Sequence, residues 1–236
     1  MKKYLDLIRY KNLIFIALIQ ILIRYSVILP ILQTYRIEPE LSNSLFYLLV
    51  IATLFIAAGA YVVNDYFDVK IDNLNKPEKQ IVEVFISKKT ASSLHQILTG
   101  LGIVIGLFLA YQLKSVTLSF VFILIPGLLW FYSASYKRQY LIGNLIIASL
   151  AALLILLVGF IELTALLAKY QDLLFDIKIP HKIYAWTGGF AVFSFLLTLA
   201  REIVKDMEDL YGDRELECRT LPIVSGIKKT KIIVSL

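Results

Sequence analysis

Cysteine and histidine are almost absent from this chain of 236 residues. The single cysteine, Cys218, cannot form a disulfide within the chain, which excludes a disulfide-bonded scaffold. The two histidines, His95 and His181, are too far apart in the sequence to form a zinc-binding motif. We therefore expect neither a thiol site nor a zinc site.

Charge is also scarce. Only 18% of the residues are Asp, Glu, Lys or Arg, whereas 58% are hydrophobic. A soluble protein spreads charge over its whole surface, but here the charges form short blocks between long apolar runs. The formal net charge is +6, yet the basic residues do not form the aromatic-interleaved face of a nucleic-acid-binding protein, so no nucleic-acid partner is expected. The composition predicts an integral membrane protein.

Six apolar runs have about the 20 residues that a helix needs to cross a hydrocarbon layer of roughly 30 Å. Because a lipid-exposed backbone must satisfy its own hydrogen bonds, we predict an all-α, polytopic transmembrane helix bundle. The first run follows a basic N-terminus without a small-residue cleavage site, so it is expected to be a retained helix. The predicted spans are Leu13–Leu32, Leu45–Val63, Leu94–Leu113, Leu118–Ser135, Leu141–Leu163 and Tyr184–Ala200.

The sequence turns apolar again at Thr230–Leu236. We expect this stretch to begin a seventh span that is cut off. Residues 1–236 would then form a single transmembrane domain that lacks its C-terminal helices.

The basic residues predict the orientation of the bundle. With six spans, the N-terminus, the loops after spans two and four, and the tail lie on one side, and this side carries most of the lysine and arginine. The positive-inside rule makes it the cytoplasmic side, in a prokaryotic-type cell membrane. Its charges are Lys2, Lys3, Arg9, Lys11, Lys70, Lys76, Lys79, Lys88, Lys89, Lys137, Arg138 and those from Arg201 to Lys231, against Arg36, Lys114, Lys169, Lys178 and Lys182 opposite.

Two clusters of three aspartates follow the second and the sixth span. In both, the aspartates are spaced i, i+3 and i+7, which places them on one face of a helix that continues beyond the membrane. Like charges this close repel each other unless a cation or a proton neutralises them. Either cluster alone could be a solvated helix end, but the repeated spacing on one side of the membrane favours a shared site. The clusters are Asp65, Asp68 and Asp72, preceded by Asn64, and Asp206, Asp209 and Asp213.

A ligand set made only of oxygen atoms selects hard cations, and Mg²⁺ typically combines one or two carboxylates with water and substrate phosphates. The clusters therefore predict magnesium ions bound to a diphosphate substrate. Cations that neutralise the leaving group should lie nearby. Lys137 and Arg138 suit this role, although topology explains them about as well. Arg201 and Lys205, one helical turn apart beside the second cluster, are stronger candidates, and Lys79 is a further one.

The sequence allows two roles for each of several polar and aromatic residues. Arg24, inside the first span, is expected either to extend to the membrane surface or to face the bundle interior. Asn144 could cap or pack a helix, or contact a substrate. An allylic cation would need aromatic faces around it, but interfacial aromatic belts explain most of the nearby rings. These rings are Tyr61, Phe67, Phe131, Tyr132 and Tyr136.

The two clusters resemble the paired motifs of the UbiA superfamily of intramembrane aromatic and lipid prenyltransferases. The first motif resembles Asn64-Asp65-x-x-Asp68-x-x-x-Asp72, and the second resembles Asp206-x-x-Asp209-x-x-x-Asp213. Further similarities are Lys76-Pro77-Glu78-Lys79, Tyr132-Ser133 with Lys137-Arg138 and Gly143-Asn144, and Thr220-Leu221-Pro222.

This resemblance implies an enzyme that moves a prenyl group from a prenyl diphosphate to a lipid or aromatic acceptor within membrane lipid. It implies that Asn64, Asp65, Asp68 and Asp72 bind one Mg²⁺ with the diphosphate, and that Asp206, Asp209 and Asp213 bind a second. It also implies nine membrane helices, of which this chain would hold six. The stretch Asn64–Pro77 is most similar to the branch that forms digeranylgeranylglyceryl phosphate, which implies a geranylgeranyl donor and a prenylglycerol phosphate acceptor.

Three alternatives were weighed against this interpretation. An aromatic acceptor, such as a hydroxybenzoate or a naphthoate in quinone synthesis, would use the same two clusters. A CDP-alcohol phosphotransferase motif would have glycine after the first aspartate, but Tyr66 follows Asp65. A membrane cation transporter would place its acidic residues near the midplane, whereas both clusters here are at one face.

Overall fold

The computed structural model describes residues 2–171 and 173–235, apart from the side chain of Lys79. Within this part of the chain, six helical segments are long and apolar enough to cross a membrane. The six predicted apolar runs lie within these segments, which extend further at most ends. Three predicted ends fall one residue outside their helix, at Leu113, Ser135 and Leu141. The segments are Tyr10–Thr34, α4 (Asn43–Asn75), α5 (Lys88–Gln112), α6 (Val116–Ala134), α7 (Ile142–Tyr170) and α9 (Ile179–Glu208).

The first span is a composite helix. It consists of α2 (Tyr10–Leu22), a π-helical turn at Ile23–Ile28, and α3 (Leu29–Thr34). The described residues form no strand, and Val82 and Ile86 make only an isolated bridge. The prediction of an all-α bundle is therefore confirmed.

Short helices occupy the connections between the spans and the region after the last one. Residues 230–235 of the predicted start of a seventh span lie in α12, and Leu236 lies outside the described residues. Further C-terminal helices stay a prediction. The short helices are α1 (Lys2–Leu7), the 3-10 turns Pro77–Lys79 and Tyr136–Arg138, α8 (Leu173–Asp176), α10 (Leu210–Glu215), α11 (Leu221–Ser225) and α12 (Ile227–Ser235).

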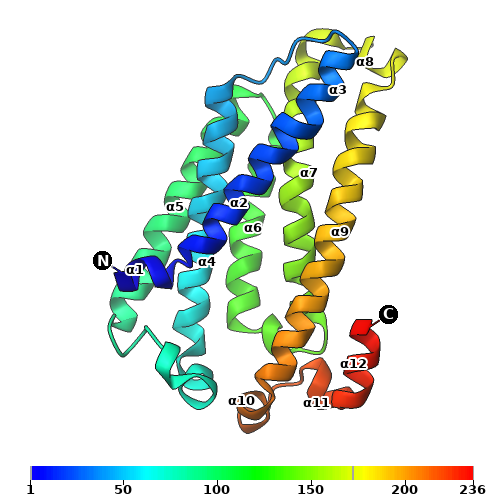
Figure 1. The fold of residues 1–236 in the computed structure, drawn as a ribbon. Coiled ribbons are helices and arrows are strands. Elements are labelled where there is room, and N and C mark those ends of the chain that lie inside the picture. The colour runs from blue at the N-terminus through cyan, green and yellow to red at the C-terminus, as the bar shows by residue number, and fades with distance from the viewer. Residues whose placement is uncertain (1, 172, 236) are drawn as a thin grey trace.

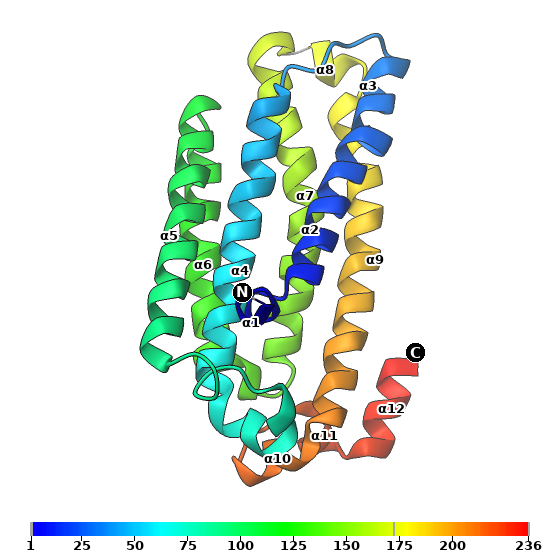
Figure 2. The same ribbon diagram turned by 60° about the vertical axis from the view of Figure 1, so that its left-hand side comes forward.

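The spans run roughly along one direction (Figure 1), with α5 and α6 on one side of α4, and with α7 and α9 on the other (Figure 2). The most extensive contacts join α4 to α5 and α7 to α9. The segment after α4 and helices α10 to α12 gather at one end of the bundle, whereas α3 and α8 lie at the other end (Figure 2). Both aspartate clusters are therefore carried to the same end.

Two glycines of α5 allow it to pack closely against its neighbours. A Cβ atom on Gly102 would lie 2.6 Å from a side-chain carbon of Ile56 and 3.0 Å from the carbonyl oxygen of Ala52, both in α4. A Cβ atom on Gly106 would overlap the ring of Phe122 in α6. Alanine at either position would push these helices apart, because packed cores have little free space.

A buried ion pair lies at the end of the bundle opposite the aspartates. Arg24 Nε donates a hydrogen bond to Glu162 Oε2 at 3.1 Å, and the two side chains are 1% and 0% exposed. Arg24 also donates to Asn43 Oδ1 at 2.9 Å and to the carbonyl oxygen of Leu41, and its guanidinium lies 4.6 Å from the ring centre of Phe46. Of the two interpretations of Arg24, the structure shows the one in which it faces the interior.

Loss of one partner from this ion pair should destabilise the bundle. In Glu162→Leu, Arg24 stays buried without its counter-ion, which typically costs about 3–5 kcal/mol. In Arg24→Met/Glu162→Leu, neither charge is left, so most of the stability should return. Thermal unfolding in detergent micelles measures both effects, and a single variant as stable as the parent protein would contradict this account.

Candidate active site

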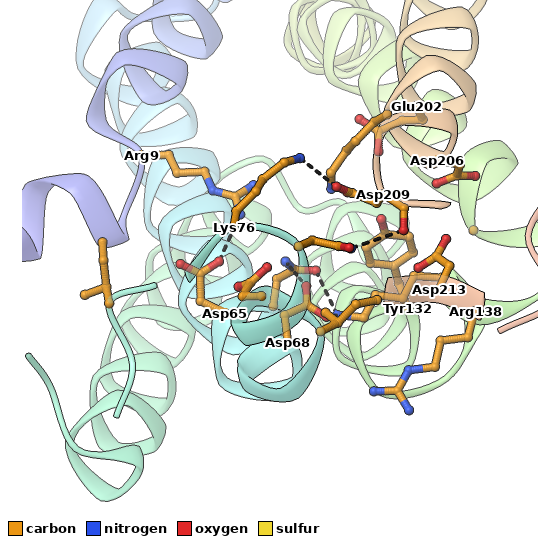
Figure 3. Close-up of a pocket in the computed structure, with 18 of the residues that line it drawn as sticks. Arg9, Asp65, Asp68, Lys76, Tyr132, Arg138, Glu202, Asp206, Asp209 and Asp213 are labelled. Atoms are coloured by element: carbon orange, nitrogen blue, oxygen red, sulfur yellow. Dashed lines mark hydrogen bonds and ion pairs between the residues drawn. The ribbon is translucent and has the colours of Figure 1, made fainter. Parts of the chain in front are cut away.

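A cavity of about 560 Å³ lies at the end of the bundle where α4 and α9 end (Figure 3). Its walls come from α1, α4 and the segment after it, the end of α6, the Tyr136–Arg138 turn, the start of α7, α9 and α10. All seven residues of the two predicted motifs line it. They are Asn64, Asp65, Asp68, Asp72, Asp206, Asp209 and Asp213.

The two motifs reach the cavity differently. Helix α4 continues without a break to Asn75, so the first three aspartates lie on one helix as predicted. Helix α9 ends at Glu208, and α10 begins at Leu210 after Asp209. Asp206 and Asp213 are therefore on different helices, and the break between them turns Asp213 back toward the cavity that Asp206 lines.

Basic side chains from distant parts of the sequence contact the first cluster. Arg9 Nη2 lies 2.9 Å from Asp65 Oδ1, and Lys137 Nζ lies 2.5 Å from Asp68 Oδ1. Asn64 links these groups, because its Nδ2 donates to Asp68 Oδ2 at 2.7 Å and its Oδ1 accepts from Lys137 at 3.3 Å. Two of the three carboxylates are thus paired with cations from other elements.

The second cluster is held mainly by neutral donors. Asn144 Nδ2 donates to Asp206 Oδ2 at 2.8 Å, and Thr220 Oγ1 donates to Asp213 Oδ2 at 3.1 Å. Asp209 instead accepts from Lys76 Nζ at 2.6 Å. Asn144, for which capping and substrate contact were both open, therefore orients a carboxylate of the cavity.

The cavity is unfavourable for uncompensated charge. The pKa of Asp213 is raised to about 6, mainly by burial and also by the nearby carboxylates of Asp209 and Asp68, against the hydrogen bond from Thr220. Burial also lowers the pKa of Lys137, although Asp68 opposes this shift. The raised pKa of Asp213 shows that its negative charge is destabilised in the cavity, so this carboxylate gains from a nearby cation.

Acidic groups outnumber basic groups around this space. Among the described residues that line it, nine are acidic and six are basic. A bare diphosphate would be repelled by this excess of carboxylates, so an anionic substrate needs divalent cations between itself and the aspartates. The acidic residues are Asp6, Asp65, Asp68, Asp72, Glu78, Glu202, Asp206, Asp209 and Asp213, and the basic ones are Lys3, Arg9, Lys76, Lys137, Arg138 and Lys205.

The donor atoms fit magnesium. The described residues of the lining supply carboxylate and amide oxygens but no histidine or cysteine, which is the set that a hard cation prefers. Within the part of the chain that the structure describes, no three acidic, histidine or cysteine side chains already converge on one point. Several carboxylates are bonded instead to Arg9, Lys137 and Lys76, so a metal would have to rearrange these contacts.

Of the basic residues predicted to neutralise the leaving group, only some line the cavity in the described part of the structure. Lys137, Arg138 and Lys205 line the cavity. Arg201 does not belong to the described lining: its side chain is 68% exposed, although it pairs at 3.5 Å with Glu202, which does line the cavity. The side chain of Lys79 lies outside the described part of the structure.

Several residues of the site were not predicted as such. Arg9 was interpreted only as a topology signal, and Lys76 as a topology signal and part of a family similarity, without a role in the site. No spacing in the sequence links Arg9 to Asp65. Glu202 could have been found, since it lies one turn before Asp206 on the same face of α9. Of the aromatic residues, Tyr132 lines the cavity, whereas Phe131 is 53% exposed and belongs to an outer chain of rings with Trp130.

Comparisons with known proteins agree with this geometry. The model of the UbiA prenyltransferase family matches residues 27–236. The digeranylgeranylglyceryl phosphate synthase of Sulfolobus acidocaldarius is 31% identical over an alignment that covers 100% of this chain and 74% of that protein. Enzymes of the same name from Saccharolobus solfataricus and Pyrococcus horikoshii are 34% and 30% identical, with 98% and 100% of this chain covered and 71% and 73% of theirs.

One solved structure, described as concerning digeranylgeranylglyceryl phosphate synthase in membranes, is also similar. It has a TM-score of 0.65 and 27% identity, and the match covers 99% of this chain and 71% of that one. The family match decides against the transporter and the CDP-alcohol phosphotransferase alternatives. The chain belongs to the UbiA prenyltransferase family and is an integral membrane prenyltransferase.

Proposed function

We propose that this enzyme transfers a geranylgeranyl group from geranylgeranyl diphosphate to geranylgeranylglyceryl phosphate and releases diphosphate. The observation that carries the proposal is the meeting of both aspartate clusters in one cavity at the end of the bundle. The relatives named as digeranylgeranylglyceryl phosphate synthases support the choice of donor and acceptor.

The family is generally magnesium-dependent. In our proposal, Asn64, Asp65, Asp68 and Asp72 hold one Mg²⁺ and Asp206, Asp209 and Asp213 hold a second. Bound magnesium would withdraw electron density from the diphosphate and so favour ionisation of its bond to the allylic C1 atom. The surplus of carboxylates in the cavity supports this assignment, because it would otherwise repel the donor.

The protein's own residues would act in three ways. Lys137 and Lys205, with Arg138 at the margin, would donate hydrogen bonds to the leaving diphosphate and stabilise its negative charge. Asn144 and Thr220 would keep Asp206 and Asp213 oriented toward the diphosphate. The low water content of a membrane cavity would protect the allylic cation until the acceptor's hydroxyl oxygen bonds to C1, and the hydroxyl proton would leave with the diphosphate.

We also propose that the cavity opens on the cytoplasmic side of the cell membrane. The excess of lysine and arginine at the site end of the spans supports this orientation. A cysteine placed at Lys89 should react with a membrane-impermeant thiol reagent only from the cytoplasmic side.

The acceptor tests the proposal most directly. In membranes with magnesium and geranylgeranyl diphosphate, diphosphate should be released when geranylgeranylglyceryl phosphate is added, and product analysis should show an ether bond at its free hydroxyl. Hydroxybenzoate and naphthoate acceptors should give no more than background. Release with an aromatic acceptor and none with the lipid would replace our proposed acceptor by the aromatic one.

Removal of one carboxylate from either cluster should abolish the reaction. Asp68→Ala and Asp209→Ala each lose a proposed metal ligand, and loss of such a group typically lowers turnover by at least about a hundredfold. Excess EDTA should have the same effect on the parent protein, with recovery on addition of magnesium. Transfer that continued in both variants, or in EDTA, would refute the metal assignment.

Arg201 and Lys205 provide a matched pair one helical turn apart. Lys205→Gln removes a cation that lines the cavity and should lower kcat/KM for the donor about tenfold or more. Arg201→Gln removes an exposed cation outside the described lining and should change kcat/KM less than about twofold. Equal losses in both variants would show that overall charge, and not position in the cavity, determines the effect.

A further inference from the structure

The end of α4 and the start of α10 are joined directly by two consecutive residues. Asn75 Oδ1 accepts a hydrogen bond from the backbone N–H of Gly212 at 2.8 Å, and Asn75 Nδ2 donates to the carbonyl oxygen of Asp209 at 3.1 Å. Lys76 Nζ lies 2.6 Å from Asp209 Oδ1 and 3.9 Å from Glu208 Oε2. The helix of the first cluster is thus bonded to the backbone and the side chain of the second.

The two contacts differ in how firmly they are held. A Cβ atom on Gly212 would lie 2.6 Å from the amide atoms of Asn75, so the backbone of α10 fits tightly against this side chain. The side chain of Lys76 is 32% exposed and that of Asp209 is 20% exposed, and a lysine ammonium is carried on four flexible methylene groups. The Asn75 contact fixes the two chain segments, whereas the Lys76 ammonium can change partners without moving them.

Lys76 also differs from the other cations that contact the clusters. Arg9 and Lys137 pair with the first cluster from elements that belong to neither motif, and Asn144 and Thr220 hold the second cluster without charge. Lys76 crosses from the first motif's own helix to the second motif's middle aspartate, as Figure 3 shows. Among the described residues, it provides the ion pair at Asp209.

We propose that Lys76 is a displaceable counter-ion of the second cluster, which leaves Asp209 when a divalent cation binds there and then bonds to the donor's diphosphate. This inference rests on the proposed function, because it assigns the divalent cation to Asp209. An ammonium and a metal ion cannot share one carboxylate oxygen at bonding distance, since they repel each other and occupy the same space. Asn75 keeps the backbone of Lys76 beside the cavity, so the released ammonium remains within reach of the substrate phosphates.

This exchange would serve both states of the enzyme. Without substrate, Lys76 offsets the repulsion among carboxylates that would otherwise push the end of α4 away from α10. With magnesium diphosphate bound, the same ammonium would add a positive charge on the leaving group. One residue would therefore stabilise the empty site and contribute to donor binding.

The first experiment measures magnesium binding by calorimetry to the full chain in detergent, without either substrate. Lys76→Gln should bind Mg²⁺ about fivefold more tightly than the parent protein, because a competing cation is gone. Lys76→Arg keeps the charge and should bind like the parent. Lys70→Gln is the matched control, since Lys70 is an exposed residue of the same helix, outside the described lining, and its loss removes the same charge.

The second experiment uses the unaltered protein and so does not depend on the folding of a variant. Acetic anhydride acetylates free lysine amines, and peptide mass spectrometry measures the extent at each lysine. Acetylation of Lys76 should rise when Mg²⁺ alone is added and fall again when Mg²⁺ and inorganic pyrophosphate are added together. Acetylation of Lys70 should not change under either condition.

The steady-state constants give a third measurement. Lys76→Gln should raise KM for the prenyl diphosphate about tenfold and leave KM for the acceptor unchanged. A variant that binds Mg²⁺ no more tightly than the parent, an acetylation of Lys76 that ignores Mg²⁺, or an unchanged donor KM would overturn the inference. Absence of Mg²⁺ binding to the parent protein would refute the metal assignment of the proposed function, which distinguishes the two failures.

Discussion

Mutual repulsion among carboxylates at the edge of the membrane is the constraint on which the rest of this structure depends. The six aspartates of the two clusters come from α4, α9, α10 and the residue between α9 and α10, and they line one cavity, where burial makes negative charge costly. The chain offsets that cost with groups from four separate segments: Arg9 before α2, Lys76 after α4, Lys137 after α6 and Asn144 in α7. Helix packing brings each of these groups to a carboxylate.

Helix α4 explains how the cavity can lie at the membrane boundary. Its 33 residues rise about 50 Å, which is well beyond the roughly 30 Å of a hydrocarbon layer. Asn43, exposed at its first turn, accepts a hydrogen bond from the buried Arg24, which pairs with Glu162. Its last three turns carry Asp65, Asp68 and Asp72. Helix α4 thus runs from the buried Arg24–Glu162 ion pair, which stabilises the far end of the bundle, to the first aspartate cluster.

The cavity with its two aspartate clusters accounts for activation of the prenyl diphosphate, which the family shares, but not for the choice of acceptor, which varies. Charge neutralisation on a diphosphate needs only the two clusters and their cations, and any prenyl diphosphate presents the same group to them. Acceptor choice depends instead on apolar and polar contacts away from the diphosphate. This is why the proposed acceptor rests on the named relatives, whereas the proposed donor chemistry rests on the cavity itself.

The sequence by itself determined the fold class, the six spans and both aspartate motifs. Each of these follows from a local pattern in the sequence. The length of the apolar runs predicts the spans, and the i, i+3, i+7 spacing identifies the motifs Asp65 to Asp72 and Asp206 to Asp213. The resemblance of the same residues to a known family added the chemistry that these motifs carry out. Glu202 could also have been predicted from the sequence, since it lies on the same face of α9 as Asp206.

Only the tertiary structure decided which distant groups meet the aspartates. Arg9 and Lys76 looked like ordinary charges at helix ends, and their ion pairs join residues 56 and 133 positions apart in the sequence. Arg201 and Lys205 looked equivalent, but Arg201 is exposed outside the described lining, whereas Lys205, one turn nearer the end of α9, lines the cavity. The side chain of Arg24 turned inward because Glu162, on a helix more than a hundred residues later, supplies its counter-ion. Such pairings depend on how helices pack, and no local spacing encodes them.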